Sequence, residues 1–177
     1  MESIHSLITA RRSCRKFTDQ PLTKEQVELL KKAALLAPTS KNNRPWHFIF
    51  ITDPELLDAL STSKPHGASF LKHATMAVVI IADPEKSDVW IEDTSIAATY
   101  LQLTAEDIGL GSCWVQIRKR MSDDQTSAAE KIKQLLDIPS CFEVASIIAL
   151  GNKAKERPAY TDADLMTDRI HDNKFQQ

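Results

Sequence analysis

The densest group of chemically useful side chains lies in residues 11–16, RRSCRK, called here the basic hexapeptide. It holds four cationic side chains and a serine hydroxyl, with no acidic residue among them. Arginine guanidinium groups match phosphate oxygens in bidentate pairs, so this composition is typical of a phosphate-binding segment. A solvated basic patch is the alternative that the hexapeptide alone leaves open. Nucleic-acid binding is disfavoured, because the chain has a formal charge of −2 and the basic residues are not interleaved with aromatic ones.

Two further segments carry polar side chains that could reach a ligand. Residues 37–46, APTSKNNRPW, are expected to form a loop between a helix and a strand, where hydroxyl and amide groups can face a ligand. Residues 153–157, KAKER, called here the basic pentapeptide, directly follow the last expected strand. Loops at strand ends are common ligand sites. Taken alone, each segment is more simply interpreted as an ordinary polar turn.

The chain has only four glycines, Gly67, Gly109, Gly111 and Gly151, and this excludes the usual phosphate-binding loops. No pair has the spacing and ending of a Walker loop, and Trp114 occupies the third glycine position of the dinucleotide-binding pattern. A phosphate-bearing cofactor would therefore be held by charged side chains. Three widely spaced cysteines and scattered histidines indicate neither a disulfide framework nor a metal site.

Hydrophobic periodicity predicts a mixed α and β chain in which these segments lie at the ends of elements. The expected strands are 47–52, 76–82, 112–117 and 143–150. The first expected helix includes residues 4, 7 and 8 and ends near the basic hexapeptide. The others are a helix capped by Thr23 and stopped by Pro38, one beginning at Pro54, 89–107 and 123–136, the last with Asp123 at its start. The run MAVVIIA at 76–82 is apolar on both faces, so we place it at the centre of the sheet. The pattern predicts a three-layer α/β or α+β domain.

Length and composition set further limits. A chain of 177 residues suits one domain with a substantial core. Its longest apolar run is far shorter than the ~20 residues that cross a bilayer, and residues 1–8 do not resemble a secretory signal. We therefore expect a soluble, cytoplasmic protein without a membrane partner. Residues 158–177 have few large apolar side chains and are expected to fray or to lie across a partner subunit.

Taken in order, RRSCRKF, APTSKNNRPWHF, GLGSCWVQ and LGN with its KER tail resemble the FMN-dependent nitroreductase family. The order and approximate spacing agree from residue 4 to about residue 157. The resemblance implies an α+β fold, a nitroreductase-like three-layer α/β/α domain over residues 1–177 with a central mixed, mainly antiparallel sheet. It also implies a homodimer with FMN at the subunit interface and the tail of residues 158–177 packed on the partner.

The resemblance assigns roles to residues of this chain. Arg11 corresponds to the arginine that holds the flavin phosphate, and Lys155 and Arg157 correspond to a basic pair that closes on it. Arg15 corresponds to a basic residue near the N1 and O2 edge of the flavin, where a cation offsets the negative charge of the reduced ring. These cations would replace the missing glycine loop.

The flavin ring has its own expected neighbours. Residues 38–40 correspond to the segment that the second subunit lays against the flavin, and residues 115–116 to the chain that passes the ring near N5. The residues expected to bind the cofactor are Arg11, Arg12, Ser13, Arg15, Pro38, Thr39, Ser40, Asn42, Val115, Gln116, Lys155 and Arg157. No metal ligand and no catalytic side chain is expected, because the flavin N5 carries the chemistry.

The implied activity is that of an FMN-dependent NAD(P)H oxidoreductase. NADH or NADPH delivers hydride to the flavin and leaves, and a nitroaromatic, quinone or similar small-molecule acceptor then takes the electrons. The alternatives are a flavin-dependent reductive dehalogenase or flavin-fragmenting enzyme of the same fold, and a non-catalytic flavin- or anion-binding module. Arg44, where the family commonly has glutamine, and the unmatched segment 63–73 keep the last alternative open. The choice between NADH and NADPH also stays open.

Overall fold

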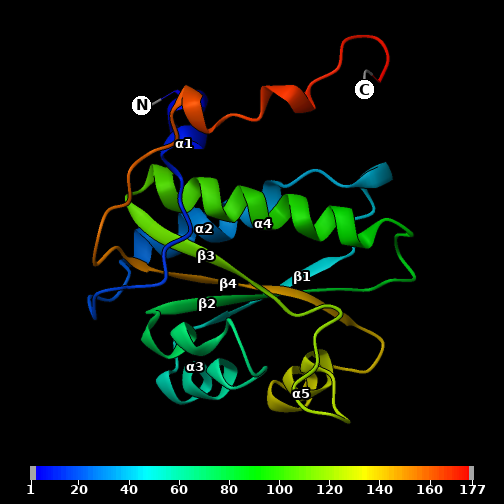
Figure 1. Cartoon of the computed structure of the whole chain (residues 1–177). Helices are drawn as coiled ribbons and strands as arrows, with labels where there is room; N and C mark the ends of the chain where they lie inside the picture. The colour runs from blue at the N-terminus through cyan, green and yellow to red at the C-terminus, as the bar shows by residue number, and fades with distance from the viewer. Residues whose placement is uncertain (1–2, 176–177) are drawn as a thin grey trace.

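A four-stranded antiparallel sheet forms the centre of the protein, shown in Figure 1 as a computed structural model in which residues 3–175 are described. Its strands are β1 (Trp46–Ile51), β2 (Met76–Ala82), β3 (Leu110–Gln116) and β4 (Glu143–Asn152). They lie in the order β1-β2-β4-β3, so β2 and β4 are central. Every residue of β2 is buried, which confirms the central position predicted for a strand apolar on both faces.

Helices cover both faces of this sheet (Figure 1). On one face lie α2 (Lys24–Leu36) and α4 (Trp90–Asp107), with α1 (Ile4–Ala10) outside α4. On the other lie α3 (Pro54–Ser61) and α5 (Ala128–Leu135). Short 3₁₀ turns complete the chain: η1 (Ser40–Asn42), η2 (Ser69–His73), η3 (Asp162–Asp164) and η4 (Thr167–Arg169). The arrangement confirms the expected three-layer α+β fold.

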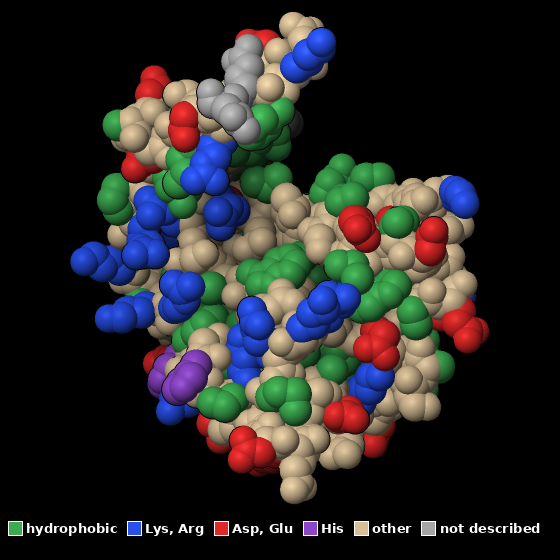
Figure 2. All heavy atoms as spheres, turned by 45° about the vertical axis from the view of Figure 1, so that its right-hand side comes forward, with side chains coloured by type: hydrophobic (Ala, Val, Ile, Leu, Met, Phe, Trp, Pro, Cys, Tyr) green, Lys and Arg blue, Asp and Glu red, His purple; other side chains and the backbone are tan. Residues whose placement is uncertain are grey.

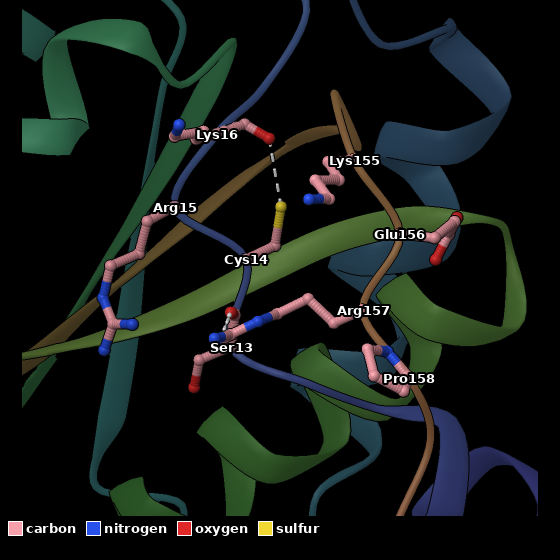
Figure 3. Close-up of a pocket in the computed structure, with 8 residues that line it drawn as sticks. All are labelled: Ser13, Cys14, Arg15, Lys16, Lys155, Glu156, Arg157 and Pro158. Carbon is pink, nitrogen blue, oxygen red and sulfur yellow. Dashed lines mark hydrogen bonds between the residues drawn. The ribbon is translucent and has the colours of Figure 1, made fainter.

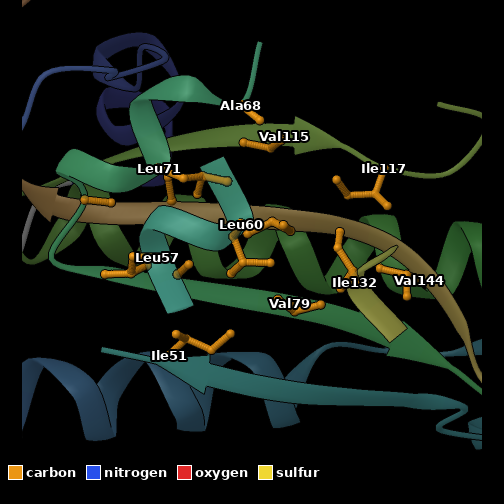
Figure 4. Packing of buried hydrophobic residues seen from close by; sticks show 14 of the residues in the cluster. Ile51, Leu57, Leu60, Ala68, Leu71, Val79, Val115, Ile117, Ile132 and Val144 are labelled. Atoms are coloured by element: carbon orange, nitrogen blue, oxygen red, sulfur yellow. The ribbon is translucent and has the colours of Figure 1, made fainter. Parts of the chain in front are cut away.

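The sheet separates two apolar cores. Figure 4 shows the core under α3 and α5, where Leu60 and Ile132 pack toward Val79 and Val115 on the strands. The second core lies under α2 and α4, and fully buried Leu101 belongs to it. Burying one such aliphatic side chain stabilises the fold by about 1.5–3 kcal/mol. The two cores together hold the sheet rigid between its helices.

Helix starts follow local capping rules. Thr23 and Gln26 form the predicted capping box of α2, and the Asp53 carboxylate accepts the first backbone N–H groups of α3, which has Pro54 at its first turn. These side chains satisfy amide donors that have no partner inside the helix.

The predicted start of the last helix at Asp123 is wrong. The N-cap is Ser127, which forms a capping box with Glu130. The Asp123 carboxylate instead accepts the N–H groups of Gln125 and Thr126, at 2.9 and 2.7 Å, and closes a turn ahead of the helix. Aspartate competes with helix formation in this way, because its side chain bonds the nearby backbone.

The tail from residue 158 runs over α1 and stands out from the body (Figures 1 and 2). The N–H of Tyr160 donates to the Thr9 carbonyl at 3.0 Å, which fixes the start of the tail. Beyond it, the large apolar side chains are exposed, and the last of them, Phe175, is 77% exposed. Within residues 3–175, no helix combines the length and apolar character needed to cross a membrane.

Candidate functional site

The basic hexapeptide and the basic pentapeptide, from opposite ends of the chain, lie side by side. The Cys14 N–H donates to the Ser112 carbonyl at 2.8 Å, which places the hexapeptide along β3. Phe17 forms an antiparallel bridge with Lys153, and the Ala154 N–H donates to the Lys16 carbonyl at 3.0 Å. Backbone hydrogen bonds therefore fix the relative position of the two segments.

Two glycines allow this close approach. Gly111 and Gly151 are paired on β3 and β4, under the hexapeptide. A Cβ atom at Gly111 would lie 2.7 Å from the Cys14 Sγ, and one at Gly151 would lie 2.9 Å from the Phe17 Cδ1. Both distances are shorter than carbon and sulfur atoms tolerate. The glycines thus let the hexapeptide and the following Phe17 pack directly on the sheet.

Between the two segments lies a cavity of about 380 Å³, called here the basic cavity (Figure 3). The Arg157 side chain extends toward Ser13, and its Nη1 donates to the Ser13 carbonyl at 3.4 Å. The Arg15 side chain lies on the other side of the hexapeptide backbone from Lys155, whereas Glu156 points away from the cavity. The lining residues are Ser13, Cys14, Arg15, Lys16, Lys155, Glu156, Arg157 and Pro158.

The basic cavity carries positive charge that the protein does not neutralise. Among residues 3–175, none of Arg15, Lys16, Lys155 and Arg157 forms an ion pair. The one acidic residue of the lining, Glu156, binds the Lys153 ammonium at 3.3 Å instead. A hydrogen bond to a charged group contributes about 1.5–3 kcal/mol, so this donor set suits a dianionic phosphate.

Lys153 anchors the basic pentapeptide to the body of the protein. Its Nζ lies 2.7 Å from the Glu106 Oε1 at the end of α4, and both side chains are largely buried. Burial alone would lower the pKa of the Lys153 ammonium, but Glu106 and Glu156 together outweigh it and hold this pKa above its ordinary value. Lys153 is therefore charged at neutral pH and orients the residues that follow it.

Arg11 lies beside the basic cavity rather than in its lining. It borders an adjoining cavity of about 710 Å³, and Ser13 lines both cavities. The other residues around the adjoining cavity are Ile8, Thr99, Gln102, Leu103, Trp114 and Tyr160. A ligand that reaches past Ser13 would meet Arg11 as well as Arg157.

Arg12 binds the tail of its own chain. Its Nη1 donates to the Pro158 carbonyl at 2.5 Å, and its guanidinium lies 4.3 Å from the centre of the Tyr160 ring. A cation over an aromatic face is an attractive contact. These contacts turn Arg12 toward the tail, outside the lining of the basic cavity.

The loop of residues 38–42 lies elsewhere in the chain, at the N-terminal end of α4 (Figure 1). The Ser40 N–H donates to the Asp93 Oδ1 at 2.8 Å, and the Asp93 Oδ2 accepts the Ser87 hydroxyl at 2.8 Å. The Thr39 hydroxyl accepts the Arg44 N–H at 3.0 Å, and the Asn42 Oδ1 accepts the Arg44 Nε at 2.9 Å.

These contacts hold the loop in one shape at a distance from the basic cavity. None of Pro38, Thr39, Ser40 and Asn42 lines that cavity. Asp93 is 2% exposed, and its hydrogen bond from the Ser40 N–H is partly buried. One chain alone therefore does not bring this loop to the hexapeptide.

Val115 and Gln116 end β3 beyond the basic cavity. The Val115 side chain is buried in the core under α3 and α5, so only its backbone can face a ligand. The Gln116 amide accepts from the Trp114 Nε1 and donates to the Arg118 carbonyl, each at 2.9 Å. The Gln116 carbonyl accepts the Lys64 ammonium at 2.8 Å.

Lys64, which sequence reasoning did not single out, lies against the end of β3. Burial lowers the pKa of its ammonium below the usual value, and the nearby Arg120 guanidinium lowers it further. Lys64 belongs to the segment that matched no family motif, and a single lysine before a proline carries no local signal. Its position follows only from its contact with β3.

Among the described residues, no group of three or more His, Cys, Asp and Glu side chains is arranged to hold a metal ion.

Comparison with known proteins agrees with this geometry. A profile of the Nitroreductase family matches residues 8–64 and 61–152. An Archaeoglobus fulgidus protein, provisionally named NADH dehydrogenase/NAD(P)H nitroreductase, is 36% identical over 180 residues, which cover 99% of this chain and 100% of the relative.

Solved structures agree too. An FMN-dependent nitroreductase from Clostridium difficile R20291 superposes with a TM-score of 0.94 at 49% identity, over 96% of this chain and 98% of that one. A protein from Parabacteroides distasonis, also provisionally named NADH dehydrogenase/NAD(P)H nitroreductase, has a TM-score of 0.89 at 30% identity, over 99% of this chain and 100% of that one. Sequence and fold together show that this chain belongs to the Nitroreductase family.

Proposed function

We propose that the chain is an FMN-dependent NAD(P)H oxidoreductase that passes electrons to a nitroaromatic, quinone or similar acceptor. The observation that carries this proposal is the basic cavity, in which unpaired cations from both ends of the chain converge beside β3. The similarity to an FMN-dependent nitroreductase and to an NAD(P)H nitroreductase supports the same cofactor and reductant.

The residues of the basic cavity fit the phosphate end of FMN. Arg157 and Lys155 supply cationic donors, Ser13 supplies a hydroxyl, and Arg11 is reached through the adjoining cavity. When bound, FMN supplies a ring atom, N5, that accepts and releases hydride. The protein holds this cofactor with charged side chains, as the scarcity of glycine requires.

The remaining side chains act by position and charge. The Arg15 guanidinium lies 5.8 Å from the centre of the Phe70 ring. A fixed cation beside a flavin ring stabilises negative charge on the cofactor edge. The backbone of Val115 and Gln116 lies at the end of β3. No nucleophile or general base is required of the side chains.

The site would be completed by a second copy of the chain. The loop of residues 38–42 is held far from its own basic cavity but presents polar groups at the surface. Exposed apolar side chains on α1, α2 and the tail offer a surface for dimer contact: Ile4, Ile8, Leu29, Leu35, Leu36, Leu165, Met166, Ile170 and Phe175. A homodimer would bury them and bring the partner's loop to the flavin. Free cysteines and the use of NAD(P)H fit a cytoplasmic enzyme.

The test uses the purified full-length protein. We expect a yellow preparation that absorbs at about 450 nm, or one that acquires this absorbance after incubation with FMN. Anaerobic addition of NADH or NADPH should bleach it quickly, and menadione or nitrofurazone should restore the colour. A protein that stays colourless after incubation with FMN would contradict the proposal. If the protein binds FMN but neither NADH nor NADPH bleaches it, the chain would instead be a non-catalytic flavin-binding module.

A further inference from the structure

A second group of basic side chains lies at the end of β3 that is farther from the basic cavity. We call Lys64, Arg118, Lys119 and Arg120 the far basic cluster. The Lys64 ammonium is fixed on the Gln116 carbonyl at 2.8 Å. The Arg120 N–H donates to the Ile117 carbonyl at 3.0 Å and closes a tight turn at this end of the strand.

The turn places three consecutive basic residues, Arg118, Lys119 and Arg120, at the end of β3. Lys119 has a φ of 58°, a left-handed conformation that non-glycine residues seldom adopt. The Arg118 guanidinium lies 5.8 Å from the centre of the Trp90 ring at the start of α4. Arg120 is close enough to Lys64 for its charge to lower the Lys64 pKa.

The far basic cluster is not neutralised by the protein. Within the described part of the chain, none of its four side chains forms an ion pair. The nearest acidic residue in sequence, Asp123, uses its carboxylate to bind the N–H groups of Gln125 and Thr126. Like charges held together without a counter-charge favour the binding of an anion.

Lys64 of the far basic cluster and Arg15 of the basic cavity both lie near Cys113 of β3, close enough for their charges to act electrostatically with its thiol. Ser112 pairs with Ser13 of the basic cavity, and Gln116 lies four residues farther along the strand. At a rise of roughly 3.3 Å per residue, the two anion-binding regions are about 13 Å apart along β3.

We infer that the far basic cluster binds the 2′-phosphate of NADPH and makes this enzyme prefer NADPH to NADH. The inference rests on the proposed function. If the flavin phosphate occupied the basic cavity, a flavin ring laid along β3 would reach toward Gln116. A nicotinamide stacked on such a ring would leave the rest of the dinucleotide near the strand end that carries the cluster. A phosphate monoester is dianionic and matches arginine donors in bidentate geometry, whereas the 2′-hydroxyl of NADH offers no charge.

The first experiment compares the two nucleotides on the FMN-loaded enzyme with menadione as acceptor. The test variant carries Lys119→Gln and Arg120→Gln, two exposed positions whose replacement leaves the cores intact. We expect the ratio of kcat/KM for NADPH to kcat/KM for NADH to fall about ten- to a hundredfold. Lys32→Gln, which removes an exposed charge on α2, is the matched control and should leave the ratio unchanged.

The other kinetic outcomes overturn the inference. An unchanged ratio would show that the cluster does not contact the 2′-phosphate. An equal loss for both nucleotides would assign the cluster to the pyrophosphate that NADPH and NADH share. A wild-type enzyme that prefers NADH would contradict the inference directly.

A second measurement does not depend on turnover. Adenosine 2′,5′-bisphosphate and adenosine 5′-monophosphate are titrated into the FMN-loaded protein by calorimetry. We expect the bisphosphate to bind at least about tenfold more tightly, and this advantage to be lost in the Lys119→Gln/Arg120→Gln variant. Equal affinity of the two nucleotides for the wild-type protein would overturn the inference. Failure of the proposed function is recognised separately, because bound flavin would then not be bleached by either NADPH or NADH.

Discussion

Arg157 and Arg12 lie near each other but differ in how far the protein already occupies their guanidinium groups. Among the described residues, the Arg157 side chain makes one hydrogen bond, a 3.4 Å contact with the Ser13 carbonyl, so most of its donors remain for a ligand. Arg12 is occupied by the Pro158 carbonyl and the Tyr160 ring. The two arginines are therefore expected to differ in their effect on cofactor binding.

Replacing Arg157 with Ala should weaken FMN binding by about ten- to a hundredfold, because charge-assisted bonds to the phosphate are lost. Arg12→Ala should weaken it less, since its guanidinium contacts the tail. Fluorescence titration of the apoprotein with FMN measures both affinities. A larger loss for Arg12→Ala than for Arg157→Ala would reverse the roles given to the two residues.

At the scale of elements, the ends of β3 and β4 matter because the basic hexapeptide packs directly on them. Gly151→Ala would place a methyl group 2.9 Å from the Phe17 Cδ1 and 3.1 Å from the Phe17 Cβ, so the segment would have to move. We expect a loss of about 1–3 kcal/mol in the free energy of unfolding, together with weaker FMN binding. Urea denaturation and the same titration measure these effects. Wild-type values for both would mean that the segment adapts without cost.

The ion pair between Lys153 and Glu106 joins the end of α4 to the basic pentapeptide. The pKa of Lys153 is raised in the folded state, so the folded protein gains stability from this group below its ordinary pKa of 10.5. That stability is lost as the pH rises through the higher folded value. Glu106→Gln removes the larger raising contribution, so it should lower the free energy of unfolding near pH 8 by about 1 kcal/mol.

The measurement is urea denaturation of wild-type protein and Glu106→Gln from pH 8 to above pH 10.5. The difference between the two proteins should shrink at the high end of this range. A constant difference would show that Lys153 does not titrate in the way its surroundings indicate. Glu28→Gln, which removes the exposed carboxylate of a surface ion pair, is the matched control.

How much of the fold could be predicted from the sequence depends on whether the signal is local. β2 was predictable, since its seven apolar residues are continuous, and α2 was predictable from Thr23 and Gln26. The start of α5 was not, because Asp123 and Ser127 are both acceptable caps, and in the structure only Ser127 forms a capping box.

The same distinction applies to the candidate site. The hexapeptide and pentapeptide were recognisable from composition and from the family pattern. Lys64 was not, because its partner Gln116 is 52 residues away and no motif connects them. The contacts of Arg12 likewise depend on a tail 146 residues distant. Long-range contacts of this kind leave no periodic trace in the sequence.

At the scale of the whole molecule, the tail exposes apolar surface that would be unfavourable in a monomer. Its large apolar side chains are exposed, and Leu165, Met166 and Ile170 are each more than half exposed. Exposed apolar groups collected on one segment are typical of a protein–protein contact. The tail is therefore expected to contribute to the proposed dimer.

A chain that ends after Tyr160 retains the contacts of Arg12 but lacks those apolar residues. We expect it to dissociate to monomers at concentrations where the full chain is dimeric, and to lose FMN because the partner's loop is no longer held. Light scattering coupled to gel filtration measures the mass, and absorbance at about 450 nm measures the flavin. A truncated chain that stays dimeric and yellow would show that the tail does not hold the subunits together.

The meeting of the two chain ends at the basic cavity has a consequence for synthesis. The hexapeptide leaves the ribosome early, but the strand and pentapeptide that complete its surroundings are made near the end of translation. Contacts so distant in sequence form late and slowly in folding. A nascent or prematurely terminated polypeptide would therefore lack one wall of the basic cavity. If the basic cavity holds the flavin phosphate, stable flavin binding would require synthesis of the final strand and the basic pentapeptide.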